Sequence, residues 1–376
     1  MACANFIGNE SQDGSEYRST GGTWSIVATP FSSLGDWALK LEKVGSATVN
    51  ARVAGNRADG RPNGEMNIST AYFRGRFMVE TAPASNEEQI MEFTDTGAST
   101  KAYVTINSSR NLKIYNNAGS LIATGSTALS LSTEYEISVK ISTGSGNTPY
   151  EILIDGVTEV SGTLNSLTGN HGSIYLGVRT NLNAQNMTIY WDDVWVDDSA
   201  YPTSGFSIVR VAPDANSSPA GFTSGTGASD YTQVDEAPPS TADYIQSGAS
   251  AASHFVTLQN TSTVGISGTI LGFKAQMMAR EVTSGTSSNR LAIKSGSTTA
   301  YTDAFNHSTS NQHICKITEV DPDTSAAWTT SGIDGATIGI DEANAIAMRC
   351  FFMSGYVAFV PAAPPSSSSN FKVYLI

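Results

Sequence analysis

The sequence predicts an all-β protein built from two antiparallel β-sandwich (jelly-roll) domains in tandem. Apolar and polar residues alternate with period two in many short runs, a pattern typical of strands that bury one face. Turn-forming pairs such as Asn63-Gly64 and Asp334-Gly335 separate these runs, and helical periodicity is almost absent. A length of 376 residues also suits two or three domains.

The clearest strands of the first half fall at residues 37–41, 73–79, 135–141 and 187–191, where every second side chain is apolar. The pair Asp155-Gly156 follows a strand at 150–154. Both central residues of a type I′ turn need a positive φ angle, so this pair predicts a tight hairpin.

A break in the pattern predicts the domain boundary. Residues 198–206 contain Pro, Gly and small polar residues without periodicity, which indicates a linker. The domains are therefore expected at 1–197 and 207–376, each long enough for its own core. In the second domain, residues 271–279 alternate like a strand, and a short helix is expected around 341–347, where a buried strand over 345–352 is the alternative.

Residues 214–253 form a long stretch rich in Gly, Ser, Ala and Pro. An unstructured loop of this length is unusual inside a compact domain. Two interpretations remain open for it: an arm that orders against a neighbouring subunit, or a meandering surface loop.

The composition argues against several classes of protein. The net charge of −13 opposes nucleic-acid binding, which needs a basic surface. No run approaches the roughly 20 apolar residues of a membrane span. Three cysteines make no disulfide framework, and Cys315 and Cys350 are expected as thiols within strands. The first eight residues lack the features of a signal peptide.

Reactive motifs are scarce. The four histidines lie in turns, at strand ends or in polar loops, where each is expected to be a surface or strand-end residue. Glu88 and Glu92 are the loose candidates for a glycosidase carboxyl pair, but solvated strand faces are the simpler explanation. Most aromatic side chains are expected to pack in the core, although exposed Trp or Tyr can stack on sugars. The sequence therefore predicts no enzyme.

Two adjacent carboxylates, Asp192 and Asp193, interrupt an aromatic strand. Successive residues of a strand face opposite sides, so one carboxylate should point inward, where it needs a partner. Calcium, held by carboxylate and carbonyl oxygens, would suit this pair. The alternative is an Asp at the strand rim that accepts backbone N–H bonds, and both interpretations stay open. Elsewhere, Asp321-Pro322-Asp323 favours an ordinary turn over a calcium loop.

The first half resembles the concanavalin A-like (laminin-G-like) jelly roll. The resemblance lies in Phe6 and in segments 34–41, 150–156 and 189–196, the last of which is similar to the final strand of that family. In the family, the Asp pair of this strand often supports a structural calcium. The Glu that usually follows the first Phe as a calcium ligand is replaced here by Ile7.

The second half is similar to a domain that follows this jelly roll in structural proteins of tailed bacteriophages. The matching segments are 231–238, 273–276 and, most specifically, 319–328. The resemblance implies a virion structural protein displayed outside the head or tail. Its expected partners are major capsid or tail proteins and further copies of itself, with no nucleic acid and no membrane. The alternatives are a carbohydrate-binding adhesin that contacts a host surface glycan and a glycan depolymerase.

Overall fold

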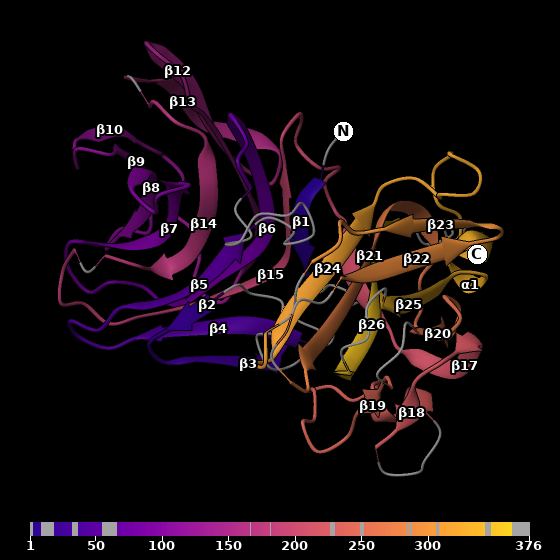
Figure 1. Ribbon diagram of the computed structural model, residues 1–376. Coiled ribbons are helices and arrows are strands. Elements are labelled where there is room, and N and C mark those ends of the chain that lie inside the picture. Colours follow the sequence, from indigo (N-terminus) through magenta and orange to yellow (C-terminus); the bar gives the residue numbers. More distant parts are fainter. Residues whose placement is uncertain are drawn as a thin grey trace, which may run out of the picture.

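The computed structural model contains four antiparallel sheets and almost no helix, which confirms the all-β class (Figure 1). It describes residues 3–8, 19–31, 37–54, 66–165, 167–180, 182–225, 230–248, 252–283, 285, 288–305, 308–342 and 347–362. Strands β1 to β15 form two of the sheets, and strands β16 to β26 form the other two. We therefore propose the boundary between the two sandwiches at 198–206.

The first sandwich has an eight-stranded and a seven-stranded sheet. The larger one has the order β13 (Val157–Asn165), β12 (Asn147–Ile154), β11 (Glu134–Ser142), β6 (Thr70–Thr81), β15 (Met187–Asp197), β4 (Trp37–Lys43) and β3 (Trp24–Ala28), and β1 (Cys3–Ile7) pairs with β15. The smaller one has the order β10 (Leu121–Thr124), β9 (Leu112–Asn116), β8 (Thr100–Asn107), β7 (Glu87–Asp95), β14 (His171–Val178), β5 (Val49–Ala54) and β2 (Ser19–Gly21).

The second sandwich has a six-stranded and a five-stranded sheet. The larger one has the order β18 (Thr223–Ser224), β19 (Ile245–Gln246), β26 (Met348–Pro361), β21 (Gly268–Glu281) and β24 (Gln312–Thr318), and β16 (Ser207–Val211) pairs with β26. The smaller one has the order β17 (Pro213–Ala220), β20 (Ala252–Leu258), β25 (Thr337–Glu342), β22 (Asn289–Ser295) and β23 (Thr298–Tyr301). The helices among the described residues are the 3₁₀ helix η2 (Asp230–Gln233) and α1 (Thr330–Asp334).

Alternating side chains build the core of each sandwich. In β11, for example, Ile137, Val139 and Ile141 are fully buried and pack against the other sheet. Asp155 and Gly156 both have positive φ angles, 50° and 77°, between the paired residues Ile154 and Val157. This geometry is the hairpin turn expected at that pair.

The structure tests two expectations for the second sandwich, the short helix and the long stretch at 214–253. The helix expected around 341–347 is wrong at its start, because Asp341 and Glu342 end strand β25; residues 343–346 lie outside the described ranges. The only α-helix in the described part is α1, whose N-cap Thr329 accepts a bond from the Gly332 N–H. Much of 214–253 is ordered within its own sandwich as β17, β18, η2, β19 and the start of β20.

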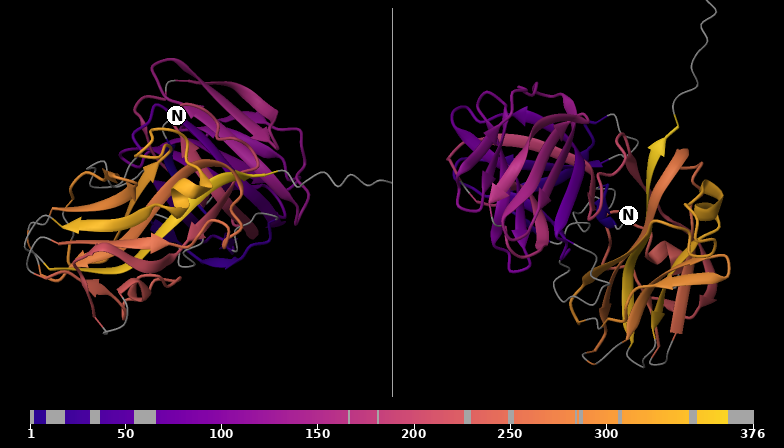
Figure 2. Two further views of the ribbon diagram at one scale, coloured as in Figure 1. Left: turned by 90° about the vertical axis from the view of Figure 1, so that its right-hand side faces the viewer. Right: turned by 90° about the horizontal axis from the view of Figure 1, so that it is seen from above.

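The two sandwiches pack side by side, with β1 at their junction (Figure 2). A small apolar cluster joins them: Trp195 of the first sandwich meets Phe206 and Ile208 beside Tyr356 and Ala358 of β26. The Trp195 and Phe206 rings meet edge to face, with centroids 5.8 Å apart. Burial of such side chains stabilises by about 1.5–3 kcal/mol each, which favours one fixed arrangement of the two units.

Candidate functional site

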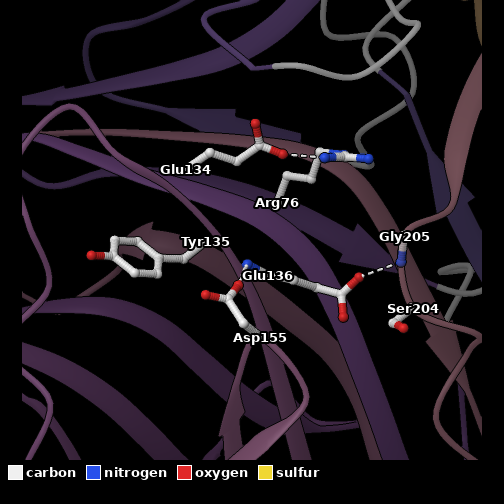
Figure 3. Close-up of a pocket in the computed structure, with 7 residues that line it drawn as sticks. All are labelled: Arg76, Glu134, Tyr135, Glu136, Asp155, Ser204 and Gly205. Atoms are coloured by element: carbon white, nitrogen blue, oxygen red, sulfur yellow. Dashed lines mark hydrogen bonds and ion pairs between the residues drawn. The ribbon is translucent and has the colours of Figure 1, made fainter. Parts of the chain in front are cut away.

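An open pocket of about 390 Å³ lies beside this junction, where β6, the start of β11 and the linker meet (Figure 3). Its lining is dominated by charged side chains. The lining residues are Arg76, Glu134, Tyr135, Glu136, Asp155, Ser204 and Gly205.

Arg76, on β6, is the centre of the charge network at this pocket. Its Nε donates to Asp193 Oδ2 at 2.9 Å, and its Nη1 forms an ion pair with Glu134. Its Nη2 donates to the carbonyl oxygen of Phe206 at 3.2 Å. Asp193 in turn accepts the backbone N–H of Ile208 through Oδ1 at 2.7 Å. One guanidinium therefore ties the first sandwich to the first strand of the second.

A β-bulge in β15 sets the orientation of Asp192 and Asp193. The register with β6 shifts between Asp192 and Trp195, and Asp193 has a φ of 45°. As a result both side chains are fully buried, which strict alternation did not predict. Burial raises the pKa of Asp193 to about 6, against the opposing effect of Arg76.

The surroundings of these two carboxylates do not fit calcium well. Asp193 already binds the Arg76 guanidinium, and Asp192 accepts the Asp193 N–H at 2.8 Å and the Thr29 hydroxyl at 3.2 Å. A calcium ion needs six to eight oxygen ligands, whereas N–H donors occupy most of this site. In the described ranges, no group of three or more His, Cys, Asp or Glu is arranged to hold a metal. Calcium at this pair stays a prediction.

The remaining acids of the pocket are held by backbone donors and by a second arginine. Glu136 accepts the Gly205 N–H at 2.8 Å and lies 3.4 Å from the Nε of Arg74. Arg74 also donates to the Pro202 carbonyl oxygen. Asp155 accepts the Glu136 N–H at 2.7 Å. The pocket therefore binds the protein's own linker, and its main effect is to fix the path of residues 202–208.

Glu88 and Glu92 do not form the carboxyl pair considered from the sequence. A bulge between Gln89 and Met91 turns the two side chains to different faces of β7, and both are fully buried. Glu88 accepts the Lys43 Nζ at 2.9 Å inside the sandwich. Glu92 forms an ion pair with Arg179 and accepts a bond from Gln89 at 2.9 Å.

The outer face of the seven-stranded sheet carries tyrosines among charged groups. Tyr103 and Tyr115 stack in parallel, with centroids 4.9 Å apart. The guanidiniums of Arg179 and Arg52 lie 4.7 Å and 5.9 Å from the ring centroid of Tyr175. We call this set the tyrosine face. The sequence shows these tyrosines but does not predict that they lie on one face, because that depends on which strands are neighbours in the sheet.

Several of the tryptophans and histidines considered from the sequence are buried. Trp191, Trp195 and Trp328 are buried, as expected for core aromatics. His171 is the first residue of β14, as expected for a strand-end residue, and it is fully buried; His254 lies within β20 and is also fully buried, which corrects the expectation of a surface position. Both side chains point into the interior of a sandwich. The direction depends on the strand around each residue, so the residue type alone does not predict it.

The aspartates 321 and 323 form a turn. The Asp321 carboxylate accepts the Asp323 N–H at 2.9 Å, and Asp323 accepts the Ser297 N–H at 3.0 Å. Within the described ranges, no helix is long and apolar enough to cross a membrane.

Comparisons with family models and with curated proteins give no match. Solved structures do resemble the chain. A Trypanosoma rangeli sialidase variant with trans-sialidase activity is 12% identical over 54% of this chain and 31% of its own, with a TM-score of 0.39. The carbohydrate-binding module CBM66 of Bacillus subtilis is 13% identical over 47% of this chain and 92% of its own, with a TM-score of 0.31.

A carbohydrate esterase of the Shiga toxin-encoding bacteriophage phi24B is 17% identical over 48% of this chain and 90% of its own, with a TM-score of 0.33. The chain spans about a quarter to a third of the sialidases. At this level the likeness concerns the β-sandwich and does not identify what this chain binds.

These comparisons correct the prediction that the chain is no enzyme. Sialidases, alginate lyases and a carbohydrate esterase are among the structures that resemble it, so the exclusion is wrong. The prediction depended on the scarcity of reactive motifs in the sequence. Groups on the outer face of a sheet and in its loops come from distant parts of the chain, and motif spacing does not detect them.

Proposed function

We propose that this chain is a tailed-bacteriophage virion protein, displayed on the outside of the head or tail, whose two sandwiches act as one rigid unit. The single observation that carries the proposal is the junction, where Asp193, held by Arg76, accepts the Ile208 N–H of β16 and Trp195 packs against Phe206. A rigid two-part unit can attach through one part and present the other. The resemblance of segment 319–328 to phage structural proteins supports the same function.

Assembly on a particle also suits the open sheet edges. Strands β13, β10 and β23 end their sheets, and exposed edges are commonly covered by symmetric association. The proposed partners are capsid or tail proteins and further copies of the chain. The proposed location is the virion, after assembly in the host cytoplasm.

Imaging of purified particles with an antibody against this chain tests the proposal. Regular labelling of the head or the tail is expected, together with the full-length chain in mass spectra of the same particles. A chain that is produced during infection but is missing from purified particles would contradict the proposal.

The tyrosine face favours a second candidate function, contact with a host surface glycan. Aromatic rings offer stacking surfaces to sugars, and Arg and Glu side chains beside them offer hydrogen bonds. Tyr103 and Tyr175 are both half-buried, with part of each ring accessible.

A glycan array with the full chain tests this second candidate. Tyr103→Ala and Tyr175→Ala are expected to lower binding at least tenfold. Tyr301→Ala is the matched control, because Tyr301 is 38% exposed and lies on the second sandwich. An array with no bound glycan, or equal loss in the control variant, would contradict the proposal.

A further inference from the structure

The face of the six-stranded sheet that points away from its own core carries four cations over aromatic rings; Lys274 and Tyr356 are buried toward the junction of the sandwiches. The pairs, with distances to the ring centroid, are Lys274 over Tyr356 at 4.6 Å, Arg210 over Phe352 at 5.4 Å, Arg280 over Phe351 at 5.1 Å and Arg349 over Tyr244 at 4.3 Å. This grouping is unexpected in a chain with a net charge of −13.

Two of these cations, Arg280 and Arg349, lie next to each other, which is unusual. They are directly opposite each other on β21 and β26, and their neighbours Ala279 and Cys350 point into the core, so both arginines lie on the outer face. Two like charges in such positions repel each other. The ion pairs of the described residues all lie in the first sandwich, so no described carboxylate lies within 4.0 Å of either guanidinium.

All Asp and Glu residues after position 206 fall in the described ranges. Asp243 immediately precedes Tyr244, yet it makes no ion pair with Arg349. Glu281 follows Arg280, but it lies on the inward side of β21 beside Met348. Among the described residues, the fold thus holds two adjacent cations without supplying a carboxylate as their counter-ion.

The rings beneath these cations fix their positions. Phe351 is fully buried, and the Tyr244 ring meets it edge to face, with centroids 6.0 Å apart. A Cβ added at Gly225 would lie 2.5 Å from the Tyr244 ring, so the loop packs tightly against it. Arg349 also donates from Nε to Gln246 Oε1 at 2.8 Å. Both arginines are half-buried, so part of each residue is accessible to solvent.

We propose that Arg280 and Arg349 form a binding site for the carboxylate of an acidic sugar. Guanidinium groups bind planar carboxylates through paired N–H bonds, and a carboxylate between them would remove their repulsion. A site of two guanidiniums suits a ligand with one anionic group. The net charge of the chain, by contrast, repels nucleic acids and other dense polyanions. This site lies on the second sandwich, apart from the tyrosine face, so the inference goes beyond the glycan contact proposed for that face.

The test uses the full chain and two matched probes, glucuronate and glucose, in saturation-transfer NMR and calorimetry. Glucuronate is expected to bind, and glucose is not. Arg280→Gln and Arg349→Gln should each weaken glucuronate binding at least tenfold. Arg290→Gln is the matched control, since Arg290 lies 5.4 Å from the Tyr301 ring on the other sheet and carries the same charge. Its glucuronate affinity should stay within twofold of that of the original chain.

Three results would overturn the site. One is glucuronate affinity that is unchanged in both Arg280→Gln and Arg349→Gln while their melting temperatures match that of the original chain. Another is equal loss in Arg290→Gln, which would indicate a general charge effect. The third is binding of inorganic phosphate as tight as that of glucuronate, which would indicate an unspecific anion site. Glucuronate binding with an empty glycan array would retain the site and reject the glycan-contact function.

Discussion

The two sandwiches differ in the groups that contact their cations. In the first, charged groups pair with carboxylates across strands and sheets, as in Lys43 with Glu88 and Arg76 with Asp193. Rings also contact cations there, as in Arg179 over Tyr175. In the second, Arg280 and Arg349 form no such ion pair with a described residue, and several cations lie over aromatic rings, as in Arg280 over Phe351. A buried ion pair leaves a costly unpaired charge when one partner is lost, whereas a ring carries no charge to leave behind. The first sandwich is therefore expected to be the more sensitive to loss of single charges.

The largest effect is expected at Lys43. Its Nζ is fully buried and contacts Glu88 Oε1 together with the carbonyl oxygens of Gly45, Asn183 and Gln185 at 2.5–2.9 Å. Lys43→Met should lower the free energy of unfolding by about 3–5 kcal/mol, because it leaves the buried Glu88 carboxylate without its cation. Urea unfolding measures this loss.

The control for Lys43 is the double variant Lys43→Met with Glu88→Leu. Removal of both charges should recover most of the lost stability, since neither is then left unpaired. A single variant that loses less than about 1 kcal/mol would contradict the expectation.

The next effect is a pH dependence at His171. Burial lowers its pKa to about 4, while its Nε2 is 3.0 Å from the Ile141 carbonyl oxygen. Between pH 4 and about 6.5 the unfolded chain binds a proton that the folded chain does not, so stability falls as pH falls. The loss should reach about 3 kcal/mol. His171→Gln should flatten this part of the curve in urea unfolding at a series of pH values, and an unchanged slope would count against the interpretation.

Asp193 should show the opposite sign. Its pKa is raised to about 6 by burial, so between pH 4 and 6 the folded chain holds a proton that the unfolded chain has released. This group alone therefore lowers stability as pH rises, by up to about 2–3 kcal/mol. Asp193→Asn should remove that decrease and keep an acceptor for the Ile208 N–H. A curve parallel to that of the original chain would contradict the expectation.

The smallest effect sharpens the comparison itself. Arg280→Gln removes a cation over Phe351 and should cost at most about 1 kcal/mol in unfolding free energy. Arg179→Gln is its counterpart in the first sandwich and should cost more, because the fully buried Glu92 then loses its cation. Differential scanning calorimetry of both variants compares the two losses, and equal losses would remove the proposed distinction.

The sequence alone determined the fold class, because a period of two is a local property of each strand. The hairpin at Asp155 and Gly156 was predictable for the same reason, since a type I′ turn needs particular residues at two adjacent positions. Residues 37–41 and 135–141 likewise show their buried face without knowledge of their neighbours.

The tertiary structure decided the candidate sites. The bulges at Asp192 and at Gln89 reverse which side chains face inward, and alternation cannot show where such a bulge falls. Arg280 and Arg349 are 69 positions apart, and only the register of β21 with β26 makes them neighbours. Strand pairing is a long-range choice set by the packing of the whole sheet, so a linear pattern does not contain it.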